Sequence, residues 1–195
     1  MTEIFVSALQ AMGYKVYTRP YEVNIIGVRS TNPVANTFGD SINVMYKDKD
    51  GSWHFHSFPA TTDPGAYWLK NPENEKGTAI LKAGQYINSH IMGMHRDKYM
   101  ALVQRGLLTV IRDADRNGQL NFKGQEDTGY FGINIHRANQ VGTTKVIDKF
   151  SAGCQVFASA DDFKTFMDLC DRHSKLYGNS FTYTLINHIS ISHSA

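Results

Sequence analysis

Short apolar segments separated by turn signals constrain the fold of this sequence more than any other feature. Four of them follow one another in the first half: EVNIIGVRS (22–30), SINVMYKD (41–48), WHFHSFPAT (53–61) and GTAILKAGQYI (77–87). Segments of this length and composition are typical of strands, and Asp50 with Gly51 supplies a tight hairpin turn between the second and the third. We therefore predict a chain built mainly from β-strands.

The second half of the chain continues the pattern. Residues 98–122 run apolar on both sides of glycine-containing turns and predict two more strands, joined by DADRNG. Residues 129–137, GYFGINIHR, predict a further strand, and residues 180–186, SFTYTLI, predict the last one. The segments TDPGAYW and KNPENEKG are predicted to be loops.

The two ends of the chain carry helical signals. Near the start, apolar residues recur at helical spacing: Ile4, Phe5, Ala8, Leu9 and Met12. Near the end, Ser159 and Asp162 form a capping box before a second apolar stripe. That stripe consists of Phe163, Phe166, Met167 and Cys170. We predict a mainly β (α+β) fold, a curled mixed sheet or small barrel with a helix near each end, in a single domain over residues 1–195.

Charge and hydropathy argue against several classes of partner. The formal net charge is +2 and the lysines and arginines are scattered, so we predict no nucleic-acid partner. Glu3 stands where a signal peptide has lysines, and no apolar run approaches the roughly 18 residues of a membrane span. We expect neither a signal peptide nor a membrane span, and the sequence predicts no particular oligomeric state.

The two cysteines have different surroundings. Cys170 lies on the apolar stripe of the second helix, where a free thiol behaves as a small core side chain. Cys154 follows the small residues Ser151, Ala152 and Gly153, which let the backbone approach a substrate closely. Converging backbone N–H groups at such a turn can lower the pKa of a thiol and bind the oxyanion of an acyl transfer. Cys154 is therefore the candidate nucleophile.

A cysteine nucleophile needs a base, and His136 is the candidate. The two-residue period of a strand puts His136 on one face together with Asn134, which we predict to support the site, and puts Arg137 on the other face. The alternative is a partly exposed strand histidine beside a buried thiol. His95, in MGMHRDKY, is either an exposed loop histidine, the favoured interpretation, or a group near the site that contacts the substrate.

The spacing of these residues resembles a family signature. His136 is followed, after fourteen residues, by SAGC (151–154). This is similar to the motif of the L,D-transpeptidase catalytic domain family, which has a histidine, a gap of about this length, and then Ser or Thr, His, Gly and Cys. The resemblance covers residues 131–157. It implies the following roles: Cys154 as nucleophile, His136 as base, Gly153 and Cys154 as backbone donors to an oxyanion, and Ser151 as a hydroxyl that lines the site.

Two positions depart from the family motif. Ala152 stands where the family usually has a second histidine, as it does in variant and phage-borne relatives. Val156 stands where many members place an arginine or asparagine that holds a substrate carboxylate. We expect Arg137 or Gln155 to contact the substrate instead, and His95 only under the interpretation that places it near the site.

The motif most resembles those of peptidoglycan-cleaving members of the family, found in bacteriophages and in toxins delivered between bacteria. The resemblance implies a cysteine-dependent hydrolase of peptidoglycan stem peptides, of the L,D-carboxypeptidase or endopeptidase type, with an acyl-enzyme on Cys154. An amine acceptor would make the protein a transpeptidase. Synthesis in the cytoplasm and delivery to the bacterial cell wall, in a virion or as a lysis protein, would fit either activity. A virion structural or wall-binding module that kept the fold and lost the chemistry is the alternative from another class.

One loop carries the residue types of a calcium site. In DADRNGQLNF, Asp113, Asp115 and Asn117 occupy positions 1, 3 and 5 of a calcium-type loop, but position 12 is Gly124 instead of glutamate. A plain hairpin turn is the favoured interpretation, and a structural calcium site is the alternative.

Two histidines lie close together in the third apolar segment. His54 and His56 share a strand face, as zinc ligands could, but no third ligand has a recognisable spacing. The sequence also contains no Walker loop and no dinucleotide fingerprint. We therefore predict no cofactor, with structural calcium as the one alternative.

Overall fold

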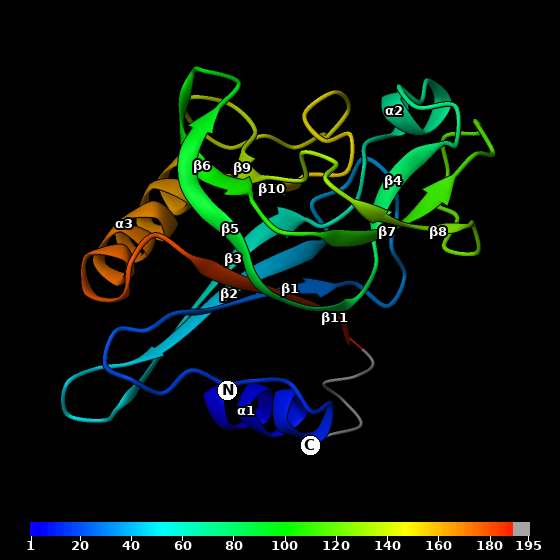
Figure 1. Cartoon of the computed structure of the whole chain (residues 1–195). Helices are drawn as coiled ribbons and strands as arrows, with labels where there is room; N and C mark the ends of the chain where they lie inside the picture. Colours follow the sequence, from blue (N-terminus) through cyan, green and yellow to red (C-terminus); the bar gives the residue numbers. More distant parts are fainter. Residues whose placement is uncertain (189–195) are drawn as a thin grey trace.

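A computed structural model describes residues 1–188 and consists mainly of strands (Figure 1). The helices are α1 Thr2–Ala11, α2 Ala66–Lys70 and α3 Ala160–Tyr177. The first five strands are β1 Asn24–Arg29, β2 Asp40–Lys47, β3 Trp53–Thr61, β4 Thr78–Leu81 and β5 Gly84–His95. The others are β6 Tyr99–Gln104, β7 Leu108–Asp113, β8 Glu126–Gly129, β9 Ile135–Arg137, β10 Gln155–Phe157 and β11 Phe181–Asn187.

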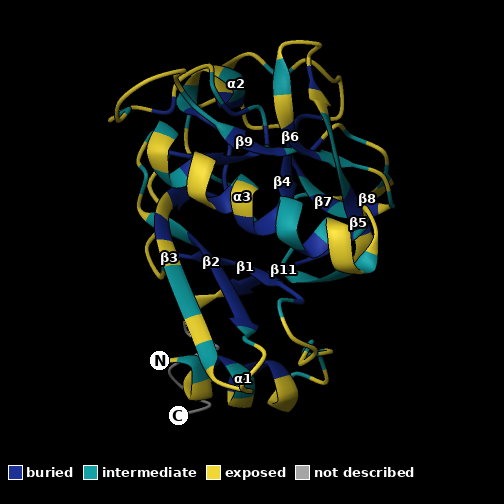
Figure 2. Cartoon of the chain, turned by 90° about the vertical axis from the view of Figure 1, so that its left-hand side faces the viewer, coloured by how far each residue is buried: buried dark blue, intermediate teal, exposed yellow. Residues whose placement is uncertain are grey.

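Eight of these strands form one strongly curled sheet. It closes into a barrel in the order β1-β11-β5-β6-β9-β10-β3-β2. Neighbouring strands are antiparallel except β1 with β11 and β9 with β10, which are parallel, so the predicted mixed, curled sheet is confirmed. The strands β4, β7 and β8 form a separate three-stranded sheet. Figures 1 and 2 both place β9 at the opposite end of the molecule from α1.

The two-residue period of the strands divides the apolar side chains between two cores. In β1, Ile25 belongs to the larger core, which also contains Phe157 and Phe166. The next residue, Ile26, belongs to the smaller core, together with Phe5 of α1. Because both faces of β1 are covered, all six of its residues are buried.

Helix α3 begins at the cap predicted from the sequence. Ser159 Oγ accepts a hydrogen bond from the backbone N–H of Asp162 at 3.3 Å. Phe163, Phe166 and Cys170 are buried on one side of the helix, and the opposite side is exposed (Figure 2). The prediction that Cys170 is a core thiol is confirmed, because the residue is only 1% exposed.

One predicted strand contains two strands of different sheets. Residues 77–87 contribute β4 to the three-stranded sheet and the beginning of β5 to the barrel. The two elements are separated by Lys82 and Ala83. A further difference is the short helix α2, which begins in the segment TDPGAYW, predicted to be a loop, and ends beyond it at Lys70. Local apolar patterning does not reveal which sheet a strand joins, because that choice depends on distant partners.

The connections between residues 98 and 137 also differ from the prediction. Strands β6 and β7 are separated at Gly106, where the N–H groups of Arg105 and Gly106 donate to Ser89 O at 2.6 and 3.0 Å. DADRNG begins at Asp113, the last residue of β7, and leads into the loop to β8. Residues 130–134 are not in a strand, because the side-chain oxygen of Gln104 accepts from two of their N–H groups and replaces the sheet ladder.

In residues 1–188, no helix combines the length and the apolar character that crossing a membrane requires.

Candidate active site

The parallel strands β9 and β10 bring the predicted nucleophile and base to one face of the barrel. His136 pairs with Val156, so Cys154, two residues earlier in the chain, lies opposite Asn134. Side chains alternate along a strand, and Cys154, Asn134 and His136 therefore share a face. The segment 138–153 provides the long crossover that a parallel pair needs.

The thiol of Cys154 lies against the backbone that precedes β9. Its side chain is half-buried, and Sγ accepts from the N–H of Asn134 and donates to Gly132 O, both at 3.4 Å. Burial raises the pKa of Cys154, and this effect outweighs the Asn134 N–H, which lowers it. A backbone N–H group thus lowers this pKa as expected, but the net shift is upward because burial outweighs it, and the thiol is protonated at neutral pH.

The imidazole of His136 is buried and held in one tautomer. Its Nδ1 lies 2.8 Å from Arg137 O, and because a carbonyl oxygen only accepts, Nδ1 carries the proton. The hydroxyl of Tyr99 donates to the same carbonyl at 3.1 Å. Burial, followed by the charge of His95, lowers the pKa of His136 to about 3. His136 is thus neutral at pH 7, with Nε2 as the nitrogen that can accept a proton.

His95, at the end of β5, packs directly on the predicted base. Its ring stacks on His136 with 4.2 Å between centroids and 20° between planes. The side-chain amide of Asn134 donates to His95 Nδ1 at 3.0 Å. The interpretation of His95 as an exposed loop residue is wrong, since it is 6% exposed and lies beside the site.

The thiol and the base are neighbours but are not hydrogen-bonded to each other. Within residues 1–188, no hydrogen bond joins Cys154 to His136, and Nε2 of His136 has no partner. Val156 is the strand partner of His136 and Cys154 lies two residues before it, so the thiol and the imidazole are diagonal neighbours across the β9–β10 pair. Such a bond often shortens only when a substrate binds.

The residues before Cys154 form a tight loop closed by Ser151. Ser151 Oγ donates to Cys154 O at 2.8 Å and accepts from the N–H of Gly153 at 3.2 Å. Gly153 has a φ of +127°, and a Cβ there would lie 2.4 Å from Ala79 O, so only glycine fits. The Gly153 N–H is thus already used, whereas the described residues offer no partner to the N–H of Cys154, which is the freer candidate donor to an oxyanion.

Two of the residues expected to contact a substrate have other roles. Gln155 is fully buried, donates to Gly153 O at 3.2 Å and accepts from the hydroxyl of Tyr183 at 2.7 Å. It therefore anchors the loop 151–154 from inside the barrel, and its predicted contact with the substrate is wrong. Arg137 lies over the ring of Tyr99 at 4.1 Å and lines a groove beside α3.

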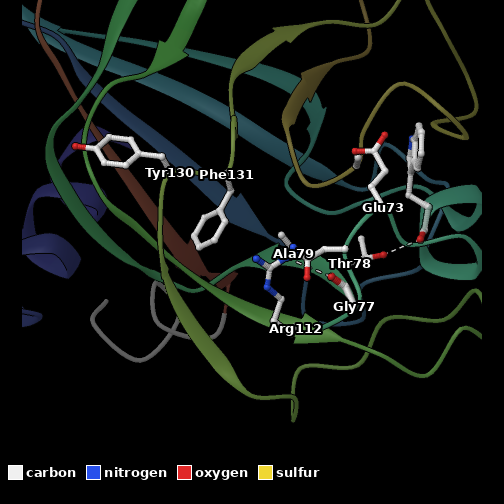
Figure 3. Close-up of a pocket in the computed structure, with 10 residues that line it drawn as sticks. Glu73, Gly77, Thr78, Ala79, Arg112, Tyr130 and Phe131 are labelled. Atoms are coloured by element: carbon white, nitrogen blue, oxygen red, sulfur yellow. Dashed lines mark hydrogen bonds between the residues drawn. The ribbon is translucent and has the colours of Figure 1, made fainter.

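A polar pocket of about 270 Å³ adjoins the loop 151–154 through Ala152. Figure 3 shows residues that line it, among them Glu73 and Arg112. The pocket is lined by Trp68, Glu73, Asn74, Gly77, Thr78, Ala79, Arg112, Tyr130, Phe131 and Ala152. Arg112 is buried, donates to Asp127 at 3.0 Å and to Gly77 O at 3.2 Å, and packs on the Phe131 ring at 4.9 Å. Sequence reasoning missed this pocket, because its walls come from α2, β4, β7 and the segments between them, with no shared motif.

The candidate calcium loop uses its ligand-type side chains to hold its own backbone. Asp113 accepts from the N–H groups of Asp115 and Asn121 at 3.1 and 3.0 Å, and Asn117 accepts from Gln119 at 2.8 Å. Such Asx turns favour the hairpin interpretation, with DADRNG at the start of the loop between β7 and β8. Among residues 1–188 there is no group of three or more His, Cys, Asp or Glu side chains suited to a metal ion.

Comparison with protein-family models, curated proteins and solved structures found no match to this chain.

Proposed function

We propose that this protein is a cysteine-dependent hydrolase of peptidoglycan stem peptides, with an L,D-transpeptidase-like catalytic fold. One observation carries the proposal: a neutral imidazole with an unused Nε2 shares a sheet face with a half-buried thiol, beside a polar pocket. The stem-peptide substrate follows from the resemblance of His136 and the SAGC segment to the family motif. Delivery to the bacterial cell wall, by a virion or as a lysis protein, belongs to the same proposal.

In the first half of the reaction the thiol becomes an acyl carrier. His136 Nε2 takes the proton of Cys154 as Sγ attacks a stem carbonyl carbon, so the S–C bond forms while the carbonyl oxygen becomes an oxyanion. The N–H of Cys154 donates to this oxygen. The tetrahedral intermediate then collapses, the peptide C–N bond breaks, and His136 returns its proton to the leaving amine, which leaves a thioester on Cys154.

In the second half water releases the acyl group. His136 Nε2 accepts a proton from water as the water oxygen attacks the thioester carbon. The C–S bond breaks and the proton returns to sulfur, which restores the neutral pair. An amine in place of water would give transpeptidation through the same steps.

The protonated resting state of the thiol explains why the base matters. With the pKa of Cys154 raised by burial, little thiolate exists at neutral pH, and attack requires simultaneous proton transfer.

A second candidate function is an inactive wall-binding module. The raised pKa of Cys154 and the lack of a Cys154–His136 hydrogen bond in the described residues favour it.

Digestion of purified wall peptides, followed by mass spectrometry, separates the two candidates. We expect cleaved stems and, at early times, a protein mass increased by the acyl group, with both signals lost in Cys154→Ala. An unmodified protein that binds walls but leaves every stem intact would support the wall-binding module. Free stem acid as product indicates hydrolysis, and a new amide indicates transpeptidation.

A further inference from the structure

A pocket of about 500 Å³ lies between the barrel and the three-stranded sheet, on the side of the molecule where Figure 1 draws β7 and β8. Arg29 and Asn187, the last residues of β1 and β11, line it from the barrel. Ile111 of β7 and Phe122 of the loop after β7 line it from the three-stranded sheet. Small-molecule sites in proteins have volumes of roughly 300–1,000 Å³, so this pocket has the size of a ligand site.

This pocket is separate from the candidate active site. Ile111 lines it, whereas the next residue, Arg112, lines the polar pocket that adjoins Ala152. Successive side chains of a strand point to opposite faces of the sheet. The two pockets therefore lie on opposite faces of β7, and they share no lining residue.

The guanidinium of Arg29 is held in a fixed orientation at this pocket. Arg29 is only 4% exposed, its Nε donates to Asp63 at 2.9 Å, and its Nη2 donates to Leu81 O at 2.9 Å. The guanidinium lies over the ring of Phe122, 4.9 Å from the centroid, and that ring also lines the pocket. Nη1 has no partner among residues 1–188, yet the fully buried side-chain atoms without a partner belong only to Arg172. Nη1 is therefore an accessible donor with a fixed direction.

The charged groups that line this pocket are both cations. Lys82 is the second, and among the described residues no acidic side chain lines the pocket. Lys82 Nζ pairs with Glu126 at 2.5 Å and has further N–H groups that can donate. The carboxylates that pair with the two cations, Asp63 and Glu126, both lie outside the lining. A ligand in the pocket thus meets apolar side chains and donors of positive charge.

We propose that this pocket binds a small monocarboxylate with an apolar body. The carboxylate accepts from Nη1 of Arg29 and from Lys82, while the body packs against Ile111 and Phe122. Charge-assisted hydrogen bonds of this kind are about twice as strong as neutral ones. The proposal goes beyond the proposed function and does not depend on it, because neither Cys154 nor His136 lines the pocket.

Three probes that share one body and differ in the head group test the proposal: phenylbutyrate, phenylbutyramide and phenylbutylamine. Binding of each probe to the full chain is measured by isothermal titration calorimetry at neutral pH and low salt. We expect the acid to bind at least about fivefold more tightly than the amide, and the amine to bind most weakly. Equal affinities for the three probes, or no binding of the acid at millimolar concentration, would overturn the proposal.

Two variants of the lining and a matched control locate the bound acid. Ala83→Trp, which fills the pocket, should abolish binding. Lys82→Gln should weaken binding about threefold, since it removes a half-exposed charge. The control is Lys76→Gln, because Lys76 also pairs with a carboxylate of β8, that of Asp127, but lines neither pocket. The control should bind as the parent does, and full affinity in Ala83→Trp or equal weakening in the two lysine variants would contradict the proposal.

The contribution of Arg29 is measured as a preference, because its ion pair with Asp63 is buried and its replacement lowers stability. Arg29→Lys keeps a cation beside Asp63 but removes the Nη1 donor. The ratio of the affinities for the acid and the amide should fall at least about twofold, and this ratio is independent of the fraction of folded protein. An unchanged ratio would show that the head group does not contact Arg29 and would overturn the proposal.

Cys154→Ala distinguishes this site from the candidate active site. We expect this variant to bind the acid with the affinity of the parent protein, whether or not wall peptides are cleaved. Loss of binding in Cys154→Ala would place the acid at the thiol and overturn the proposal. Retained binding together with intact wall peptides would leave this site in place and contradict the proposed hydrolase alone.

Discussion

Two pairs of histidines in this molecule have opposite surroundings. His95 and His136 lie at the β9–β10 end, buried and stacked at 4.2 Å, and Nε2 of His136 has no partner in the described residues. His54 and His56 lie on β3, where His54 Nε2 is paired with Asp48 at 2.8 Å and both rings stack on Tyr46. His54 and His56 are two residues apart in sequence, and the hydrogen-bond partner of His54 lies in the same hairpin.

This difference shows what separates a structural histidine from a candidate base. On β3, His54 is hydrogen-bonded to Asp48 in the hairpin turn, and both rings stack on Tyr46. At the β9–β10 end, Nδ1 of His136 donates to a backbone carbonyl and burial keeps the ring neutral. Nε2 is therefore the nitrogen that can accept a proton. A buried, neutral ring on the same sheet face as a thiol therefore distinguishes the candidate base from the two histidines of β3, which are not buried.

The largest expected effect is on activity. His136→Ala should lower kcat/KM for wall peptides by roughly 10²–10⁴-fold, because proton transfer by a positioned base contributes about this much. His54→Ala should change it less than about twofold, since that ring is exposed and remote from β9–β10. Equal losses in the two variants, measured on the same peptides, would remove the distinction between the pairs.

The pH dependence of stability should also distinguish the pairs. Since burial lowers the pKa of His136 to about 3 from 6.5, the unfolded chain binds a proton that the folded chain does not at pH values between these two. The contribution of neutral His136 to the free energy of unfolding is fully present above pH 6.5. It is lost as the pH falls toward 3, by at most about 5 kcal/mol. The free energy of unfolding, measured with urea between pH 7 and about pH 4, should depend less steeply on pH for His136→Gln than for His54→Gln. The acid limb of kcat/KM should lie well below pH 6.5 for the same reason.

The two thiols extend the comparison to packing. Cys170→Ser should lower the free energy of unfolding by about 1–3 kcal/mol, because a hydroxyl would be buried without a partner on the apolar side of α3. Cys154→Ser should have a smaller effect on stability and should abolish the acyl-enzyme. A chemical denaturation series measures both, and a larger loss for Cys154→Ser would place that thiol in the core instead of the site.

The smallest effect is expected from calcium. The carboxylates of the loop after β7 already accept hydrogen bonds from its own backbone, so we expect the melting temperature to rise by no more than about 1 °C in millimolar calcium. A rise of many degrees that disappears in Asp113→Ala would show that the loop binds calcium in spite of these hydrogen bonds.

Local signals in the sequence were sufficient for much of the fold. The apolar period of β1 to β3, the hairpin at Gly51 and the Ser159 cap of α3 depend on neighbours within a few residues, and each is present as predicted. The apolar stripe of α3 likewise predicted that Cys170, unlike Cys154, is a core thiol. The motif spacing also identified the strand and the loop whose pairing brings His136 and Cys154 to one face.

Only the tertiary structure decided the rest, because burial and long-range contacts have no local signature. The division of residues 77–87 between two sheets depends on which distant strands accept β4 and β5. The stacking of His95 on His136 joins residues of strands far apart in the chain, and their shared burial, not their identity, keeps His136 neutral. The same burial raises the pKa of Cys154, where the sequence alone suggested a lowered one. A sequence names the groups that can react, but their charge states follow from how much water and which neighbours the fold leaves around them.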